Sequence, residues 1–116
     1  MDIRKSKDVP RRLTEKCHGG DGTLFCQNLI AGLGSTELRL MHNDFLPAGV
    51  SIGRHEHLTN EEIYYLLSGK GILTFDDKTY EMKSGDVSLC LRGHSHAFEA
   101  IDDCVLIVVA TNRDEQ

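Results

Sequence analysis

Apolar and polar residues alternate along several short stretches of the chain, and this alternation is typical of β-strands with one buried face. In residues 38–43 the even-numbered side chains fall on one face and the odd-numbered ones on the other. Stretches of the same kind occupy residues 24–31, 63–67, 72–75, 87–91, 97–101 and 105–110. The pattern therefore predicts a chain made mostly of short strands.

Residues that favour turns separate these stretches, among them Gly69, Asp77 and Gly85. Short strands with turns every 8–12 residues or so indicate an antiparallel sandwich or barrel. No helix of ordinary length is expected, although residues 8–16 could form one short helical turn. The sequence thus predicts an all-β fold.

Composition narrows the class of protein further. The 116 residues are expected to form one domain, residues 1–116, with residues 1–16 as a flexible, basic N-terminal segment. A net charge of −5 argues against nucleic acid as a partner, because binding to nucleic acid needs a concentrated basic face. No stretch approaches the ~20 apolar residues of a membrane-spanning helix, and no apolar secretory signal is visible. We therefore expect a cytoplasmic protein with reduced cysteines and no membrane contact.

Histidines and glutamates are the residues most suggestive of chemistry. His55 and His57 lie two positions apart, so on an extended strand both imidazoles project from one face. Glu61 and Glu62 follow at once, and either carboxylate could join them; Glu62 shares a strand face with Tyr64. Together with a third imidazole, these side chains would suit Mn, Fe, Ni, Zn or Cu better than Mg or Ca.

A third imidazole comes from the segment His94-Ser95-His96. Gly93 favours a turn just before it, so we expect His96 at the start of a strand and His94 either in a loop or just outside the ligand set.

These residues occur in two segments that resemble the conserved motifs of the cupin family. Residues 49–69 contain Gly, five residues, His-x-His, four residues, Glu62, six residues and Gly, as in the first cupin motif. Residues 85–100 resemble the second motif in part, because Leu91 stands where the motif has Pro and Ala100 where it has Asn. Neither departure falls on a metal ligand.

The resemblance implies a double-stranded β-helix, or jelly roll, with a metal inside one end of the barrel. It implies that one divalent transition metal per chain is bound by His55, His57, Glu62 and His96. It also implies a homodimer, and the strand edges of a small sandwich favour such pairing.

Several functions remain open, because cupins include both enzymes and non-catalytic binders. We expect a small metal-dependent enzyme that acts on a small polar molecule, a sugar or an organic acid; the alternative is a metal-dependent module that binds or senses a small ligand. No catalytic residue is assigned. Strand alternation places Tyr64 and Leu66 on the Glu62 face and Phe98 on the His96 face, where we expect them to line the substrate cavity; for Tyr64 and Phe98 the alternative is packing in the core. His42 is a further candidate for the cavity, and the alternative for it is a buried, hydrogen-bonded imidazole.

Overall fold

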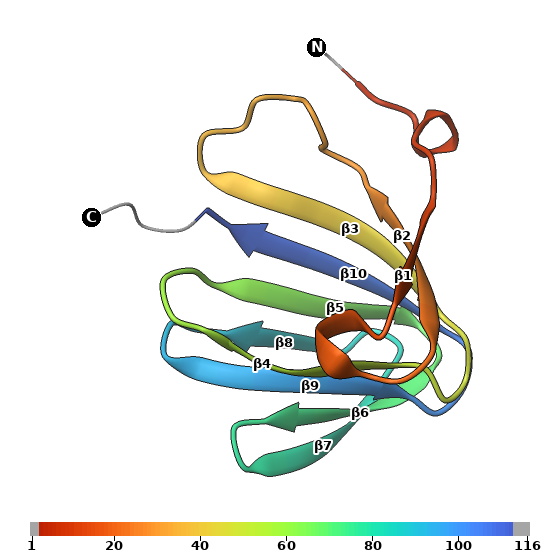
Figure 1. Ribbon diagram of the computed structural model, residues 1–116, viewed down its shortest axis with the longest axis vertical. Helices are drawn as coiled ribbons and strands as arrows, with labels where there is room; N and C mark the ends of the chain where they lie inside the picture. Colours follow the sequence, from red (N-terminus) through yellow and green to blue (C-terminus); the bar gives the residue numbers. More distant parts are fainter. Residues whose placement is uncertain (1–2, 113–116) are drawn as a thin grey trace.

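The protein folds as two antiparallel β-sheets that pack face to face, as the computed structural model of residues 3–112 shows (Figure 1). Two short 3-10 turns, η1 (Ser6–Asp8) and η2 (Cys17–Gly19), flank the first strand. The strands of this part of the chain are β1 (Arg12–Glu15), β2 (Thr23–Asn28), β3 (Leu38–Leu46), β4 (Ser51–His57), β5 (Glu62–Ser68), β6 (Lys70–Phe75), β7 (Lys78–Lys83), β8 (Val87–Cys90), β9 (His94–Ala100) and β10 (Cys104–Thr111).

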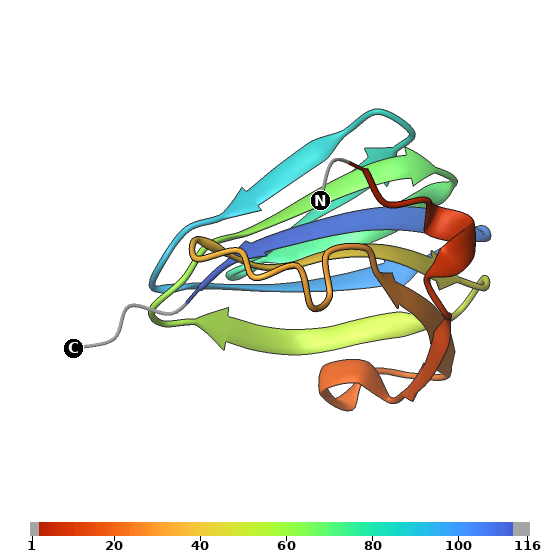
Figure 2. The same ribbon diagram turned by 90° about the horizontal axis from the view of Figure 1, so that it is seen from above.

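The order of the strands is that of a jelly roll. The larger sheet has the order β1-β2-β3-β10-β5-β8 and the smaller sheet the order β4-β9-β6-β7. The chain therefore passes from one sheet to the other between β3 and β4 and again between β4 and β5. Figure 2 shows β10 (blue) running between β5 and β3, the two strands with which it pairs. The all-β prediction and the predicted jelly roll are confirmed.

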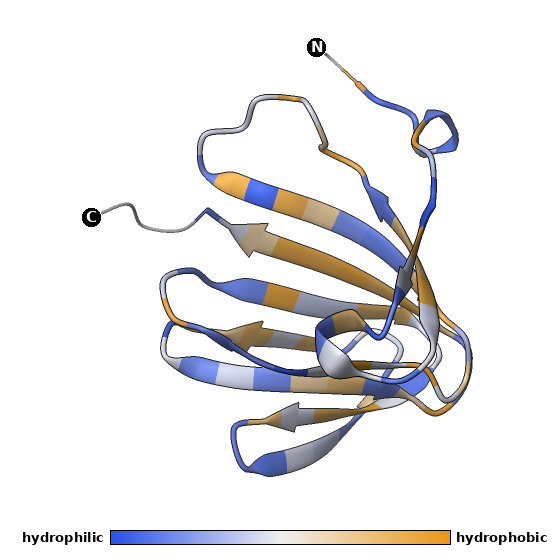
Figure 3. Cartoon of the chain, viewed as in Figure 1, coloured by the Kyte–Doolittle hydropathy of each residue, from blue (hydrophilic) through white to orange (hydrophobic). Residues whose placement is uncertain are grey.

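The core fills the space between the sheets. Leu46, Leu66 and Leu106 from the larger sheet are fully buried, and they belong to one cluster with Ile52 and Phe98 from the smaller sheet. Figure 3 shows that β10 is apolar along most of its length. Its residues alternate between buried and half-buried positions, so both faces of this central strand carry apolar side chains.

Two elements differ from the sequence-based expectation. The helical turn allowed within residues 8–16 is wrong, because residues 12–15 form β1, in which Leu13 pairs with Phe25 of β2. The sequence also does not predict β7, since Met82 is its only buried residue and no apolar face marks the strand. Residues 1–2 of the expected N-terminal segment lie outside the described residues.

No helix within residues 3–112 has the length and apolar character needed to cross a membrane.

Candidate metal centre

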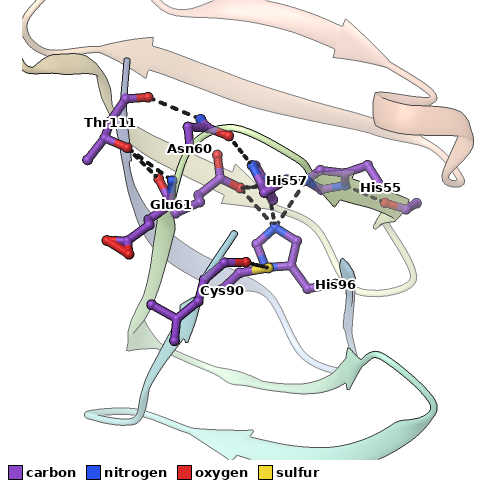
Figure 4. A network of polar contacts seen from close by, with 10 residues as sticks. His55, His57, Asn60, Glu61, Cys90, His96 and Thr111 are labelled. Carbon is purple, nitrogen blue, oxygen red and sulfur yellow. Dashed lines mark hydrogen bonds and ion pairs between the residues drawn. The ribbon is translucent and has the colours of Figure 1, made fainter. Parts of the chain in front are cut away.

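Three histidines and one glutamate, Glu62, converge on a single point. Figure 4 shows the three imidazoles turned toward one another. The Nε2 atom of His96 lies 3.0 Å from the Nε2 atoms of His55 and His57. The same atom lies 3.0 Å from Oε1 of Glu62. That carboxylate oxygen is also 3.3 Å from His57 Nε2 and 3.6 Å from His55 Nε2. Strands β4, β5 and β9 thus bring together the four residues that the resemblance to cupins implies as ligands.

Hydrogen bonds on the outer sides of two rings decide which nitrogens face this cluster. Nδ1 of His55 lies 2.8 Å from the Gly53 carbonyl oxygen, and Nδ1 of His57 lies 2.9 Å from Oδ1 of Asn60. The Asn60 amide is oriented by its own donation to the Thr111 carbonyl, at 3.1 Å. Both partners of the rings are therefore acceptors, so each Nδ1 carries the proton and each Nε2 turns a lone pair toward the cluster.

Protons alone cannot satisfy the nitrogen and oxygen atoms that meet in the cluster, because these atoms outnumber the N–H groups that could donate to them. A proton on His96 Nε2 could be donated to only one of the three atoms that lie 3.0 Å away. A divalent cation would satisfy all four donor atoms at once, and three nitrogens with one oxygen suit a first-row transition metal. The residues present therefore fit a metal.

His96 is held by packing. Its Nδ1 atom is buried and has no hydrogen-bond partner within residues 3–112. Its ring instead lies almost parallel to that of Tyr64, with centroids 4.2 Å apart and an interplanar angle of 9°. Tyr64 follows Glu62 by two residues on the inner face of β5. One strand therefore supplies a residue of the cluster and also the surface that supports another residue of the cluster.

A β-bulge in β4 sets the direction of its two histidines. Ile52 pairs with Phe98 and His55 with His96, so β4 takes three steps where β9 takes two. Without the extra residue, Ile52 and His55 would point to opposite faces; with it, both point inward. Gly53 lies in this bulge, and a Cβ atom there would be 2.1 Å from the carbonyl oxygen of His18. The close approach of the two backbones therefore requires glycine.

Two residues of the cluster, Glu62 and His96, are held in the protonation states that bind metals. Burial would raise the pKa of Glu62, but hydrogen bonds with His55 and His96 outweigh burial and hold that pKa well below its usual range. Burial lowers the pKa of His96. An ionised carboxylate and a neutral imidazole are the forms that coordinate a metal.

A pocket of about 440 Å³ adjoins the cluster. His55 and His57 line it on the cluster side, and the ring of His18 stacks on that of His55 with centroids 3.8 Å apart. Burial and the neighbouring His55 ring lower the pKa of His18. The other lining residues are Arg39, Glu56, Leu58, Thr59 and Asn60.

Arg39 reaches this pocket through a second bulge. In the pairing of β3 with β10, Leu40 lies opposite Ala110 and Leu38 opposite Thr111, so Arg39 is the extra residue. A bulge of this kind redirects a side chain. The guanidinium and the ring of His18 give the pocket hydrogen-bond donors that suit an anion.

The four residues expected to line the substrate cavity lie elsewhere. Tyr64, Leu66 and Phe98 are at most 1% exposed and belong to the core, where only Tyr64 stacks on a residue of the cluster. His42 lines a separate pocket together with Cys26. The side chains that line the pocket beside the cluster are thus different ones.

The two alternative ligands lie outside the cluster. His94 is the first residue of β9, and the expectation of a loop position is wrong because the turn ends at Gly93. Its Nδ1 lies 2.6 Å from Oδ2 of Asp76. Glu61 is not part of the cluster, which contains Glu62 instead. The backbone N–H of Glu61 donates to Thr111 Oγ1 at 3.0 Å.

Residues 42–110, more than half of the chain, match the family model of the cupin domain. This chain is a cupin. An oxalate-binding protein from Thermotoga maritima is 34% identical to it over 100 residues, which are 85% of this cupin and 82% of the relative.

Solved structures agree with this assignment. A crystal structure described as a predicted oxalate decarboxylase from Thermotoga maritima has a TM-score of 0.88 and 28% identity, and the match covers 94% of this cupin and 97% of that chain. The polyketide cyclase RemF from Streptomyces resistomycificus has a TM-score of 0.75 at 22% identity, covering 99% of this cupin and 82% of the cyclase. The second likeness is one of fold alone.

Sequence reasoning missed three residues of the site: His18, Arg39 and Asn60. Asn60 lies in the four-residue gap between His57 and Glu62, and its position there was a usable signal. His18 approaches the cluster because η2 packs tightly against β4. Arg39 reaches the pocket beside the cluster because of a bulge in β3. Both depend on contacts between distant parts of the chain, which the sequence pattern does not reveal.

Proposed function

We propose that this cupin binds a small carboxylic acid at one divalent transition metal, Mn, Fe, Ni, Zn or Cu, held by His55, His57, Glu62 and His96. The convergence of three imidazole nitrogens on one carboxylate oxygen, with separations of 3.0–3.6 Å, is the observation that carries the proposal. When bound, the metal supplies a positive charge and a Lewis acid for the anion.

The lining of the pocket supports a carboxylate as the ligand. Arg39 offers a guanidinium that pairs with carboxylates through two parallel hydrogen bonds, and His18 offers a further N–H donor. The volume of about 440 Å³ lies at the lower end of the range for small-molecule sites. The name of the Thermotoga relative, an oxalate-binding protein, favours a short dicarboxylate within this class.

Calorimetric titration of the metal-loaded protein with oxalate tests the proposal. We expect binding that disappears when the metal is stripped and weakens about tenfold or more in the variant Arg39→Gln, by analogy with the loss of a charge-assisted hydrogen bond. Arg54→Gln is the matched control, because Arg54 is exposed on β4 and donates to Ser95 Oγ, 3.2 Å away. Oxalate binding that is equal with and without metal would refute the proposal.

Turnover of the same ligand is a second candidate function. It is favoured by His18 and Glu56, two groups at the pocket that are able to carry a proton. Decarboxylation of hydrogen oxalate would break the carbon–carbon bond, release carbon dioxide and place the proton on the carbon that becomes formate. Formate release from metal-loaded protein, lost in His18→Gln, would distinguish an enzyme from a binding module; bound oxalate recovered unchanged would favour the module.

We further propose that the protein is a homodimer formed through the outer face of its larger sheet. This face carries exposed apolar side chains on β5 and β8, including Tyr65 opposite Val87 and Ile63 opposite Leu89. Val87 is 65% and Leu89 48% exposed, which is unusual for a cluster of large apolar residues that meets only water. Sedimentation equilibrium should report a dimer, and Val87→Lys with Leu89→Lys should give a monomer that still binds metal.

A reducing compartment such as the cytoplasm suits this protein, because Cys17, Cys26, Cys90 and Cys104 are all free thiols.

A further inference from the structure

A second group of metal-ligating side chains lies on β2 and β3 and shares no residue with the first. The sulfur of Cys26, a ring nitrogen of His42 and a carboxylate oxygen of Asp44 all lie within 4.8 Å of one another. Cys26 stands directly opposite Asp44 in the β2–β3 pairing, and His42 precedes Asp44 by two residues. The three side chains therefore share one face of the sheet.

The geometry points to a zinc site formed by Cys26, His42 and Asp44. Sulfur, imidazole nitrogen and carboxylate oxygen are the three donor types that bind Zn²⁺ in proteins. The first cluster contains no sulfur, so the two sites differ in the metals they prefer.

Asp44 supplies an independent reason to place a cation here. The residue is 4% exposed, and its Oδ1 atom has no hydrogen-bond partner within residues 3–112. The Nδ1 atom of His42, 3.7 Å away, is too distant for a hydrogen bond to that oxygen. A buried carboxylate oxygen without a partner is costly, whereas a bound cation would satisfy it.

The charges of the cluster suit a divalent cation. Zinc binding would form a Zn–S bond and release the thiol proton to solvent, with no change of oxidation state. The thiolate and the carboxylate together would balance the two charges of Zn²⁺.

A pocket of about 320 Å³ adjoins this cluster and is lined by both Cys26 and His42. Thr14 and Arg12 of β1 and Asn28 of β2 also line it. Three protein ligands beside a pocket leave a fourth tetrahedral position open to water or to a small molecule. The cluster thus has the ligand count of an open zinc site.

Cobalt provides a test in which the two metal sites give different signals. The full-length protein, stripped of metal and kept reduced, is titrated with Co²⁺ and followed by absorption. We expect two equivalents to bind, and we expect a near-ultraviolet sulfur-to-cobalt charge-transfer band for the one at Cys26. Added Zn²⁺ should displace this cobalt and abolish the band.

Variants assign the band to its ligands. Cys26→Ser should lose the band and one equivalent, whereas Cys17→Ser, which removes a half-buried thiol outside the cluster, should keep both. His57→Ala should lose the other equivalent and keep the band, so failure of the first site and failure of this one are distinguishable. If the Cys26→Ser variant still binds one equivalent of cobalt, that variant is folded. If it binds none, the variant Asp44→Asn replaces it, and we expect Asp44→Asn to lose the same sulfur-to-cobalt band.

The wild-type protein giving no thiolate band, or Cys26→Ser or Asp44→Asn retaining it, would overturn the zinc site.

Discussion

The ring of Tyr64 lies flat against the ring of His96, with their centroids 4.2 Å apart. This contact orients His96 in the way that hydrogen bonds to Gly53 and Asn60 orient His55 and His57. Stacking therefore fixes the ring of His96, and hydrogen bonds fix the rings of His55 and His57.

Removing the Tyr64 ring should therefore affect both stability and metal binding. Tyr64→Ala should lower the free energy of unfolding by about 3–5 kcal/mol, as is typical when a buried aromatic ring is removed. It should also weaken metal binding in the molecules that remain folded, because His96 loses its support. Denaturant unfolding and calorimetric metal titration measure the two effects. Tyr64→Phe keeps the ring and is the control; a folded Tyr64→Ala protein with unchanged metal affinity would show that the stacking is incidental.

His57 and His94 should differ sharply in their effect on metal affinity. His57 belongs to the cluster, whereas His94 is paired with Asp76, 2.6 Å away, and its side chain is 44% exposed. His57→Ala should weaken metal binding by more than the roughly 10–100-fold that is typical of losing an outer partner of a ligand. His94→Ala should leave the affinity close to that of the wild type. Calorimetric titration of both variants gives the comparison, and equal losses would mean that His94 contributes to the site.

The fold could be predicted from the sequence where one face of a strand is buried. Residues 105–110 and 63–67 carry that signal, and both form strands of the larger sheet. The strands β1 and β7 lie at the sheet edges and bury little, so the alternation that reveals a strand is weak in both. The lack of a buried apolar face is why these two were missed, since β8 also lies at a sheet edge and its alternation was visible in residues 87–91.

The four residues of the cluster could be predicted from the sequence because the spacing within a motif reflects strand geometry. His55 and His57 share a face at a spacing of two, and Glu62 begins the following strand. The residues that line the pocket could not be predicted in the same way, because strand alternation does not reveal β-bulges. The extra residue in β3 turns Arg39 toward the pocket, while Leu66 and Phe98, on regular strands, pack into the core.

Asn60 should be essential for strong metal binding although it is not a ligand. Its Oδ1 accepts a hydrogen bond from Nδ1 of His57 at 2.9 Å, which keeps Nε2 free for a metal. Asn60→Ala should reduce metal affinity by about 10–100-fold, the usual effect of losing such a partner. Asn60→Asp retains an acceptor and should bind more tightly than Asn60→Ala. Equal affinities for the two variants would indicate that the hydrogen bond does not determine the tautomer of His57.

Metal retention should fall steeply as the solution becomes acidic. Protons compete with a metal for imidazole nitrogens, whose ordinary pKa is about 6.5, and three such nitrogens face the cluster. Burial lowers the pKa of His96, so this ring takes up its proton at a lower pH than an exposed histidine does. Dialysis at about pH 5 followed by elemental analysis should therefore show metal loss, with full retention near pH 7. Metal that stays fully bound at about pH 5 would count against ligation by the three histidines.

The same shift determines how the stability of the metal-free protein depends on pH. Because the pKa of His96 is lower in the folded state, the unfolded chain binds more protons as the pH falls below about 6.5. The free energy of unfolding should thus decrease through that range, independently of any metal. His96→Gln should remove this part of the dependence, whereas His94→Gln should retain it. A free energy of unfolding that stays constant below about pH 6.5 would count against the lowered pKa of His96.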